Sequence, residues 1–103
     1  MGAYDIDEEH IFKKLERIVK NFTKNANSII VETSTNDYWE NPEFIENEDV
    51  MDEINDLDIE KDYDWQVEDV FSLKVIGNVM YMTSDTGGYS YGGDYFDAKV
   101  IKK

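Results

Sequence analysis

The chain has 103 residues, 41% of them hydrophobic and 14% aromatic, and a formal net charge of −14. This composition is too apolar for a disordered acidic tail and predicts one globular domain over residues 1–103. The absence of cysteine excludes disulfides, thiolate metal sites and cysteine nucleophiles. No apolar run is long enough to span a membrane and no signal-peptide pattern opens the chain, so we expect a cytoplasmic protein.

The negative charge is concentrated in residues 28–69. This segment holds 16 of the 24 carboxylates and a single cation, Lys61, whereas the two flanking segments together sum to +1. A strongly acidic protein repels nucleic acid and anionic membranes, so we expect it to bind neither directly. A partner that is steered by charge should be basic, and enzymes that bind DNA are the commonest proteins of that kind.

Residues 7–22 are predicted to form an amphipathic helix. Acids crowd its first turn and bases follow later, as the helix dipole favours. Because the dipole accounts for these bases, we assign them no role in nucleic-acid binding. After an Asn-Ala-Asn break, residues 28–33 have the β-branched content of a strand, with Glu32 near its end. The apolar positions that recur at helical spacing are Ile11, Leu15, Ile18, Val19 and Phe22.

The sequence Asn41-Pro42-Glu43 is typical of a helix start, with Asn as the cap and Pro at the first helical position. The apolar positions that follow predict an interrupted helix to about Asn55, with Ile45 or Val50 and Ile54 turned inward. This second helix completes the α-helical part of the predicted fold.

A β-hairpin is predicted at Ile76-Gly77-Asn78-Val79, because Gly-Asn lies between two hydrophobic runs. Residues 79–83 form its return strand, residues 86–93 a glycine-rich loop, and residues 95–101 a last strand. The order α-β-α-β-β-β predicts an α+β domain in which two helices lie on one side of an antiparallel sheet of about four strands.

The densest acidic run, residues 56–65, alternates carboxylates with apolar side chains. In an extended chain this period of two places carboxylates along one edge, about 6.5 to 7 Å apart. Phosphates follow one another along a nucleic-acid strand at about 6 to 7 Å. The sequence leaves open whether the run is a strand, a helix end or a loop, and whether it is only a solvated acidic face. Its carboxylates are Asp56, Asp58, Glu60, Asp62 and Asp64.

Catalytic and metal-binding patterns are missing from the sequence. His10 is the only histidine, and no base accompanies the serines and tyrosines, so we expect no enzymatic activity. An EF-hand loop starting at Asp56 requires Gly and Glu where Lys61 and Val67 stand, so we assign no calcium loop. We expect neither a cofactor nor a metal site.

A resemblance to a known family begins at the hairpin. Asn78-Val79-Met80-Tyr81-Met82-Thr83-Ser84-Asp85, followed by Tyr89, resembles the Asn-Val-Met-x-x-Thr-Ser-Asp-x-x-x-Tyr segment of the phage uracil-DNA glycosylase inhibitor family. Ile29-Ile30-Val31-Glu32-Thr33-Ser34 is similar to the first strand of that family, and Pro42-Glu43-Phe44-Ile45-Glu46-Asn47 to the start of its second helix. The chain departs from the family in a longer acidic centre, a shorter hairpin and the Gly-Tyr loop.

The resemblance implies a mechanism in two parts. The first strand of such inhibitors enters the DNA groove of the enzyme, where Glu32 of this chain would replace a phosphate. A pocket between the sheet and the second helix holds an apolar side chain that the enzyme otherwise inserts into DNA. The resemblance places Met80, Met82 and Ile45 in that pocket, with Asp85 beside it. A methionine pair at this spacing is also typical of an ordinary core.

These observations support the hypothesis of an acidic DNA mimic that occupies the DNA-binding site of a host enzyme, with uracil-DNA glycosylase favoured. The alternatives are an anti-restriction or anti-CRISPR protein, an immunity protein that neutralises a basic nuclease, and an acidic domain with a structural role. The predicted partner-binding residues are Glu32, Glu43, Ile45, Glu46, Asp56, Asp58, Glu60, Asp62, Asp64, Met80, Met82 and Asp85.

Overall fold

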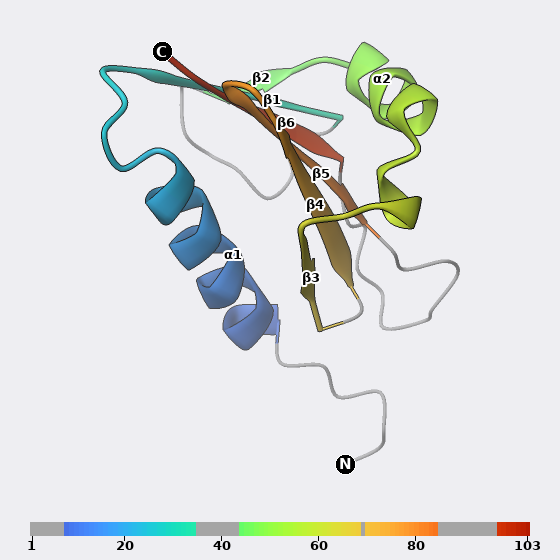
Figure 1. Ribbon diagram of the computed structural model, residues 1–103, viewed down its shortest axis with the longest axis horizontal. Coiled ribbons are helices and arrows are strands. Elements are labelled where there is room, and N and C mark those ends of the chain that lie inside the picture. The colour runs from blue at the N-terminus through green and yellow to red at the C-terminus, as the bar shows by residue number, and fades with distance from the viewer. Residues whose placement is uncertain (1–7, 35–43, 69, 85–96) are drawn as a thin grey trace.

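The computed structural model describes residues 8–34, 44–68, 70–84 and 97–103, which form one mixed sheet with two α-helices (Figure 1). Neither helix in these ranges is long and apolar enough to cross a membrane. The elements, in chain order, are α1 (Glu8–Phe22), β1 (Ile29–Thr33), β2 (Phe44–Glu46), α2 (Asp49–Leu57), the 3-10 helix η1 (Ile59–Lys61), β3 (Trp65–Val67), β4 (Phe71–Ile76), β5 (Val79–Ser84) and β6 (Ala98–Lys102).

The six strands lie in the order β2-β1-β6-β5-β4-β3. β1 and β2 are parallel, and all the other neighbours are antiparallel. The prediction of a small α+β domain is confirmed. The expected antiparallel sheet of about four strands is only roughly matched, because the sheet has six strands and β2 runs parallel to β1. Sequence periodicity missed the two edge strands because each has only three residues, too few to show a period of two.

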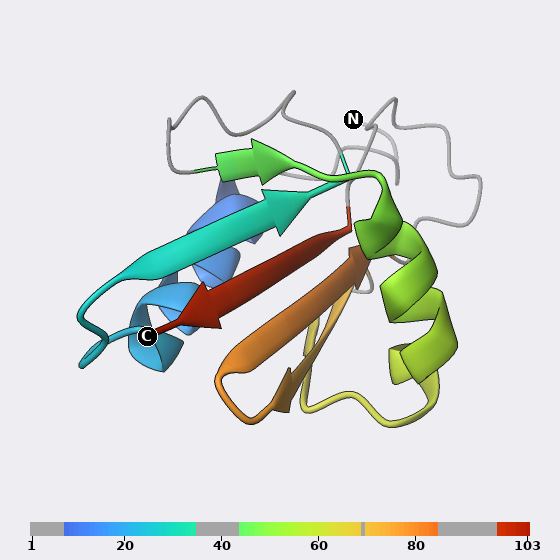
Figure 2. The ribbon, with the colours of Figure 1, turned by 90° about the horizontal axis from the view of Figure 1, so that it is seen from above.

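The two helices lie on opposite faces of the sheet, not on one side as predicted (Figures 1 and 2). Successive side chains of a strand point to opposite faces. On β5, Met80 and Met82 belong to the core under α1, whereas Tyr81 packs against the smaller cluster under α2. The order of elements along the chain does not determine which face a helix covers.

Helix α1 agrees with its prediction because its apolar spacing supplies one buried face. Ile11 and Leu15 are fully buried, and Ile18, Val19 and Phe22 pack against the same core. The side chain of Lys102 donates a hydrogen bond from Nζ to the carbonyl oxygen of Phe22 at 3.2 Å. This bond partners one of the carbonyls that a helix leaves unpaired at its C-terminal end.

The second helix begins later than predicted. Residues 44–46 pair with β1 as the short strand β2, because the open edge of β1 offers backbone partners that local propensity does not reveal. Asn47 ends this strand by donating its N–H to the carbonyl oxygen of Thr33 at 2.7 Å. The Oδ1 atom of Asn47 then accepts the N–H of Asp49 at 3.1 Å, which starts α2. Asn41, Pro42 and Glu43 lie outside the described residues.

The acidic run of residues 56–65 is not extended. It contains the end of α2, the whole of η1 and the first residue of β3. Asp58 has a left-handed backbone, with φ 52° and ψ 46°, and its N–H donates to the carbonyl oxygens of Ile54 and Asn55. Ile59 is buried against Val50 and Ile54. This burial turns the chain back under α2, so the carboxylates of the run do not share one edge.

The predicted hairpin is confirmed. Ile76 pairs with Val79 across the two-residue turn, and Gly77 has φ +62°, a conformation that glycine adopts without steric cost. The last strand, β6, covers Ala98–Lys102, close to the predicted residues 95–101. Residues 95 and 96 lie outside the described ranges.

The turn at Asp58 predicts different costs for two neighbouring apolar residues. Ile59 is 2% exposed and Leu57 is 40% exposed. Ile59→Ala should lower the free energy of unfolding by about 3 kcal/mol. The control Leu57→Ala should cost less than about 1 kcal/mol. Urea denaturation followed by circular dichroism measures both values, and equal losses would contradict the burial of Ile59.

Candidate partner-binding surface

The outward face of α2 carries a row of exposed carboxylates. Val50 and Ile54 are the buried residues of this helix, so positions about half a turn away face solvent. Glu48, Asp52 and Asp56 follow one another at intervals of four residues, which separates them by about 6 Å along the helix axis. We call this set the α2 acidic ridge; its members are Glu48, Asp49, Asp52 and Asp56, all of them exposed.

Within the described ranges, no member of the α2 acidic ridge has a side chain in an ion pair. Other acids of the same segment are engaged by the chain's own cations. Asp58 contacts Lys61 at 2.9 Å, and Asp62 contacts Lys74 at 2.9 Å. The ridge therefore presents its charge outward without a compensating cation on the helix.

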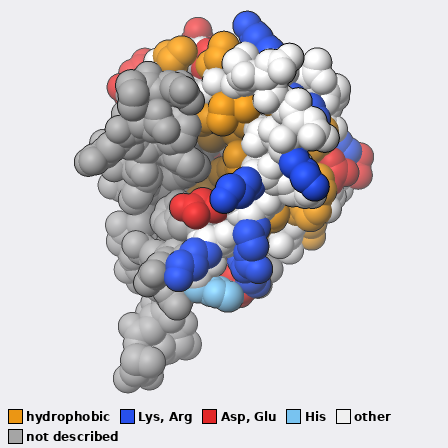
Figure 3. Space-filling model, turned by 90° about the vertical axis from the view of Figure 1, so that its left-hand side faces the viewer, with side chains coloured by type: hydrophobic (Ala, Val, Ile, Leu, Met, Phe, Trp, Pro, Cys, Tyr) orange, Lys and Arg blue, Asp and Glu red, His pale blue; other side chains and the backbone are white. Residues whose placement is uncertain are grey.

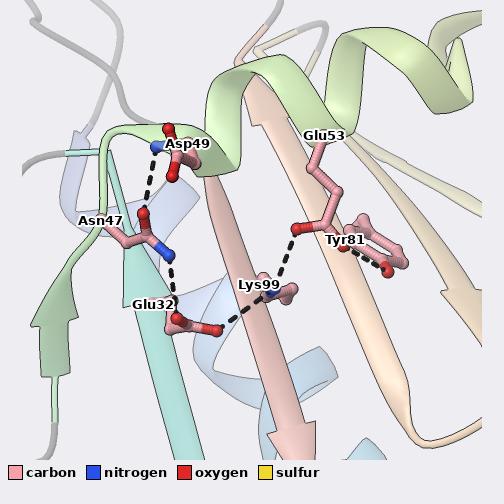
Figure 4. A network of polar contacts seen from close by, with 6 residues as sticks. All are labelled: Glu32, Asn47, Asp49, Glu53, Tyr81 and Lys99. Carbon is pink, nitrogen blue, oxygen red and sulfur yellow. Dashed lines mark hydrogen bonds and ion pairs between the residues drawn. The ribbon is translucent and has the colours of Figure 1, made fainter.

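Beneath α2, a network of polar side chains joins the helix to the sheet (Figure 4). Lys99 of β6 lies between two carboxylates, with Nζ 2.8 Å from Oε2 of Glu53 and 3.2 Å from Oε2 of Glu32. The hydroxyl of Tyr81 donates to Oε1 of Glu53 at 3.1 Å. Asn47 donates from Nδ2 to Oε1 of Glu32 at 3.0 Å. The network thus connects β1, β5 and β6 with the start and the middle of α2.

The network keeps its groups in their ordinary charge states at neutral pH. The hydrogen bond from Lys99 lowers the pKa of Glu53. Burial lowers the pKa of Lys99, but hydrogen bonds to Glu53 and Glu32 outweigh burial and raise it. Burial and the neighbouring Glu53 carboxylate raise the pKa of Tyr81. Glu53 is therefore a carboxylate, Lys99 an ammonium and Tyr81 a neutral phenol, which is the combination that the observed hydrogen bonds require.

Glu32 belongs to this internal network. Its side chain is 19% exposed, and both carboxylate oxygens have partners within the chain, Lys99 and Asn47. A carboxylate can accept about four hydrogen bonds, so these two partners fix the Glu32 side chain without filling all of its acceptor sites. In this structure Glu32 connects β1 with β6 and with the residues that start α2.

Met80 and Met82 do not line a pocket next to the second helix. Both are 0% exposed and belong to the core on the α1 face of the sheet. The expectation that they lie between the sheet and the second helix is wrong, because even positions of β5 point away from α2. Tyr81 occupies the α2 side instead. Ile45, the third predicted pocket residue, lies on the edge strand β2 and is 51% exposed.

The structure separates the other predicted contact residues. Asp64 accepts the N–H of Val75 on Oδ2 at 2.9 Å, so it holds the start of β3 against β4. Glu46, Asp56 and Glu60 are exposed. Only Asp56 of the acidic run belongs to the α2 acidic ridge. The predicted residues Glu43 and Asp85 lie outside the described residues.

Positive charge gathers on the side of the molecule where α1 lies, away from α2 (Figure 3). The bases of α1 lie there, and among them Lys14 forms an ion pair with Glu68. Nε2 of His10 is 3.3 Å from Oε1 of the same glutamate. The hydrogen bond from Lys14 holds the pKa of Glu68 below its usual value. The two faces of the sheet therefore differ in charge as well as in the helix that covers them.

Sequence reasoning missed Glu53, Lys99 and Tyr81, because nothing in their spacing reveals contacts across strands and helix. Glu48 and Asp52 of the ridge had a signal that was overlooked. They recur with Asp56 at i, i+4 and i+8, opposite Val50 and Ile54, which is the pattern of an amphipathic helix.

No protein-family model, curated protein or solved structure matches this chain. Within residues 8–34, 44–68, 70–84 and 97–103, no three histidine, aspartate or glutamate side chains are grouped in a way that could hold a metal ion.

The lowered pKa of Glu53 predicts a stability difference that depends on pH. A carboxylate with a depressed pKa stabilises the fold above its unfolded pKa, near 4.5, and the effect is lost as pH falls through the folded value. At pH 7, Glu53→Gln should cost about 1 kcal/mol, a figure reduced for partial exposure. The cost should shrink below pH 4.5 in urea denaturation. Asp52→Asn, which removes a carboxylate of the same helix that takes no part in the network, serves as the control, and an equal cost of the two substitutions at pH 7 would contradict the role of Glu53.

Proposed function

We propose that this chain is an acidic DNA mimic that occupies the DNA-binding site of a host enzyme in the cytoplasm. The observation that carries this proposal is the α2 acidic ridge, a row of solvent-facing carboxylates that form no ion pair with any cation in the described part of the chain. The proposal includes no catalytic role, no cofactor and no direct contact with nucleic acid.

The spacing of the α2 acidic ridge supports mimicry of a phosphate backbone by carboxylates on a helix. Glu48, Asp52 and Asp56 follow one another at about 6 Å along the helix axis. Phosphates along one nucleic-acid strand are separated by about 6 to 7 Å. Lysines and arginines that are arranged to contact successive phosphates could therefore meet successive carboxylates of the ridge.

The charge around the ridge supports rapid association with a basic surface. Residues 44–68 hold 11 carboxylates and one cation, Lys61. A local field of one sign raises the rate at which an oppositely charged partner is encountered, and salt screens this effect. The ridge would thus act mainly on the association rate.

A stable complex also needs apolar side chains that lose their contact with water. The described residues expose six large hydrophobic side chains, and five of them lie within residues 44–65. Met51 and Leu57, at 47% and 40% exposure, are on α2 itself. These side chains can supply the anchor that Met80 and Met82, buried under α1, do not supply. The remaining three are Ile45, Tyr63 and Trp65.

Uracil-DNA glycosylase is the favoured partner because of the sequence resemblance at residues 78–89. The burial of Met80 and Met82 favours a second candidate class, in which the same acidic surface covers another basic enzyme. Members of this class are anti-restriction and anti-CRISPR proteins, and immunity proteins that neutralise a basic nuclease. Both classes use the α2 acidic ridge, and they differ in the enzyme that it binds.

A uracil-excision assay tests the favoured partner. Purified protein should abolish excision from a uracil-containing duplex at nearly equimolar concentration, since a mimic competes directly for the DNA site. The matched control is the same assay with a DNA glycosylase that removes a different base. Unchanged uracil excision in excess protein would reject this partner, and a pull-down from host lysate should then be searched for nucleases.

Neutralising the α2 acidic ridge tests the surface itself. Asp52→Asn with Asp56→Asn should slow association with the partner about tenfold at low salt, and the effect should shrink at high salt. The control, Glu16→Gln with Glu68→Gln, changes net charge equally but lies away from α2. Surface plasmon resonance at two salt concentrations measures both rates. Equal slowing by the two double variants would show that only net charge matters.

A further inference from the structure

A cavity of about 480 Å³ lies where α1 ends and the chain turns into β1, beside the β4–β5 hairpin. This is the end of the sheet away from α2 (Figure 2). The volume falls within the range of small-molecule sites, about 300 to 1,000 Å³. The cavity is open to solvent, so a ligand could enter without a change in the fold.

The lining of the cavity is basic in an otherwise acidic protein. Lys24, Lys102 and Lys103 are among the lining residues, and no aspartate or glutamate is among those described. These lysines come from the turn after α1 and from the end of the chain, so only the fold brings them together. A basic enclosure of this kind attracts an anion in spite of the net charge of the whole molecule.

Four asparagines surround the same cavity: Asn21, Asn25, Asn27 and Asn78. None of their side chains makes a hydrogen bond within the part of the chain that the structure describes. Each amide offers two N–H donors and one acceptor. Together with the lysines they form a set of donors that the fold itself does not use.

Backbone hydrogen bonds hold the rim of the cavity in place. The N–H of Asn27 donates to the carbonyl oxygen of Lys103 at 2.7 Å, and the N–H of Lys102 donates to that of Asn78 at 3.0 Å. The Nζ atom of Lys102 lies 4.4 Å from the centre of the Phe22 ring. A site whose frame is already ordered loses less entropy when it binds a ligand.

The dipole of α1 explains why Lys102 lies at this cavity, but it does not explain why Lys24 and Lys103 lie there. α1 ends at this cavity, and its last carbonyls carry partial negative charge. Lys102 neutralises this end through its bond to the carbonyl oxygen of Phe22. Lys24 and Lys103 are exposed and form no ion pair within the described residues. Their charge is available to a ligand.

We infer that this cavity binds the phosphate group of a free nucleotide. A phosphate accepts several hydrogen bonds and carries the charge that lysines recognise. The size of the cavity leaves room for the sugar that is attached to the phosphate. This site is separate from the α2 acidic ridge, so it does not rest on the proposed function.

The test is a titration of ¹⁵N-labelled protein, monitored by NMR, with four probes: inorganic phosphate, adenosine monophosphate, adenosine and a short single-stranded oligonucleotide carrying a 5′-phosphate. Phosphate and the monophosphate should shift the backbone amides of Asn25, Asn27 and Asn78, and adenosine should not. Binding of the monophosphate with these amides shifted supports the inference. Tighter binding by the 5′-phosphorylated oligonucleotide would overturn it, because the site would then take the end of a nucleic-acid strand.

Lys24→Gln with Lys103→Gln should weaken binding of the monophosphate about tenfold. The control, Lys13→Gln with Arg17→Gln, removes the same charge from the outer face of α1 and should change affinity less than about twofold. Two further results would overturn the inference: no shift of the lining amides by any phosphate-bearing probe, or equal weakening by the two double variants. Far-UV circular dichroism confirms that each variant is folded.

Discussion

The attachment of α2 to the sheet depends on Lys99. The helix contributes only Val50 and Ile54 to the small apolar cluster on its face of the sheet, with Ile59 of η1 beside them. Its remaining contact is polar, and without a cation the carboxylates of Glu53 and Glu32 would face each other across the junction. Lys99 lies between them at 2.8 and 3.2 Å. One lysine therefore allows an acidic helix to pack on a strand that also carries an acid.

The acids of the central segment divide into two groups with different physical roles. Glu53 and Asp62 pair with lysines of other elements, Lys99 and Lys74, and hold parts of the chain together, whereas Asp58 pairs locally with Lys61. Those of the α2 acidic ridge repel one another, and like charges at i, i+4 destabilise a helix by about 0.2 to 0.5 kcal/mol per pair. The helix dipole offsets this cost near Glu48 and Asp49 but not at the other end, near Asp56. Because folding does not require this repulsion between carboxylates, we take its presence as support for the proposed binding role of the α2 acidic ridge.

The fold was predictable where its elements are local. α1, β1 and the hairpin at Gly77 follow from apolar spacing, β-branched content and a turn residue, all of which act within a few positions. The residues of β2 were predicted to belong to a helix, because three residues are too few to show the alternation of a strand. Their pairing with β1 depends on the unpaired edge of β1, which is distant in the sequence. The sequence left the conformation of the acidic run open for a related reason, since its alternating pattern does not record that Ile59 is buried against α2.

The sequence by itself determined where the negative charge lies, that two helices and several strands form, and that Met80 and Met82 share one side of a strand. Composition and short-range periodicity carry this information, so no partner element is needed to read it. Only the tertiary structure decided which face of the sheet each helix covers, which acids the chain's own lysines neutralise and which acids remain free. Those outcomes depend on contacts between residues far apart in sequence, such as Glu53 with Lys99, and local pattern does not record them.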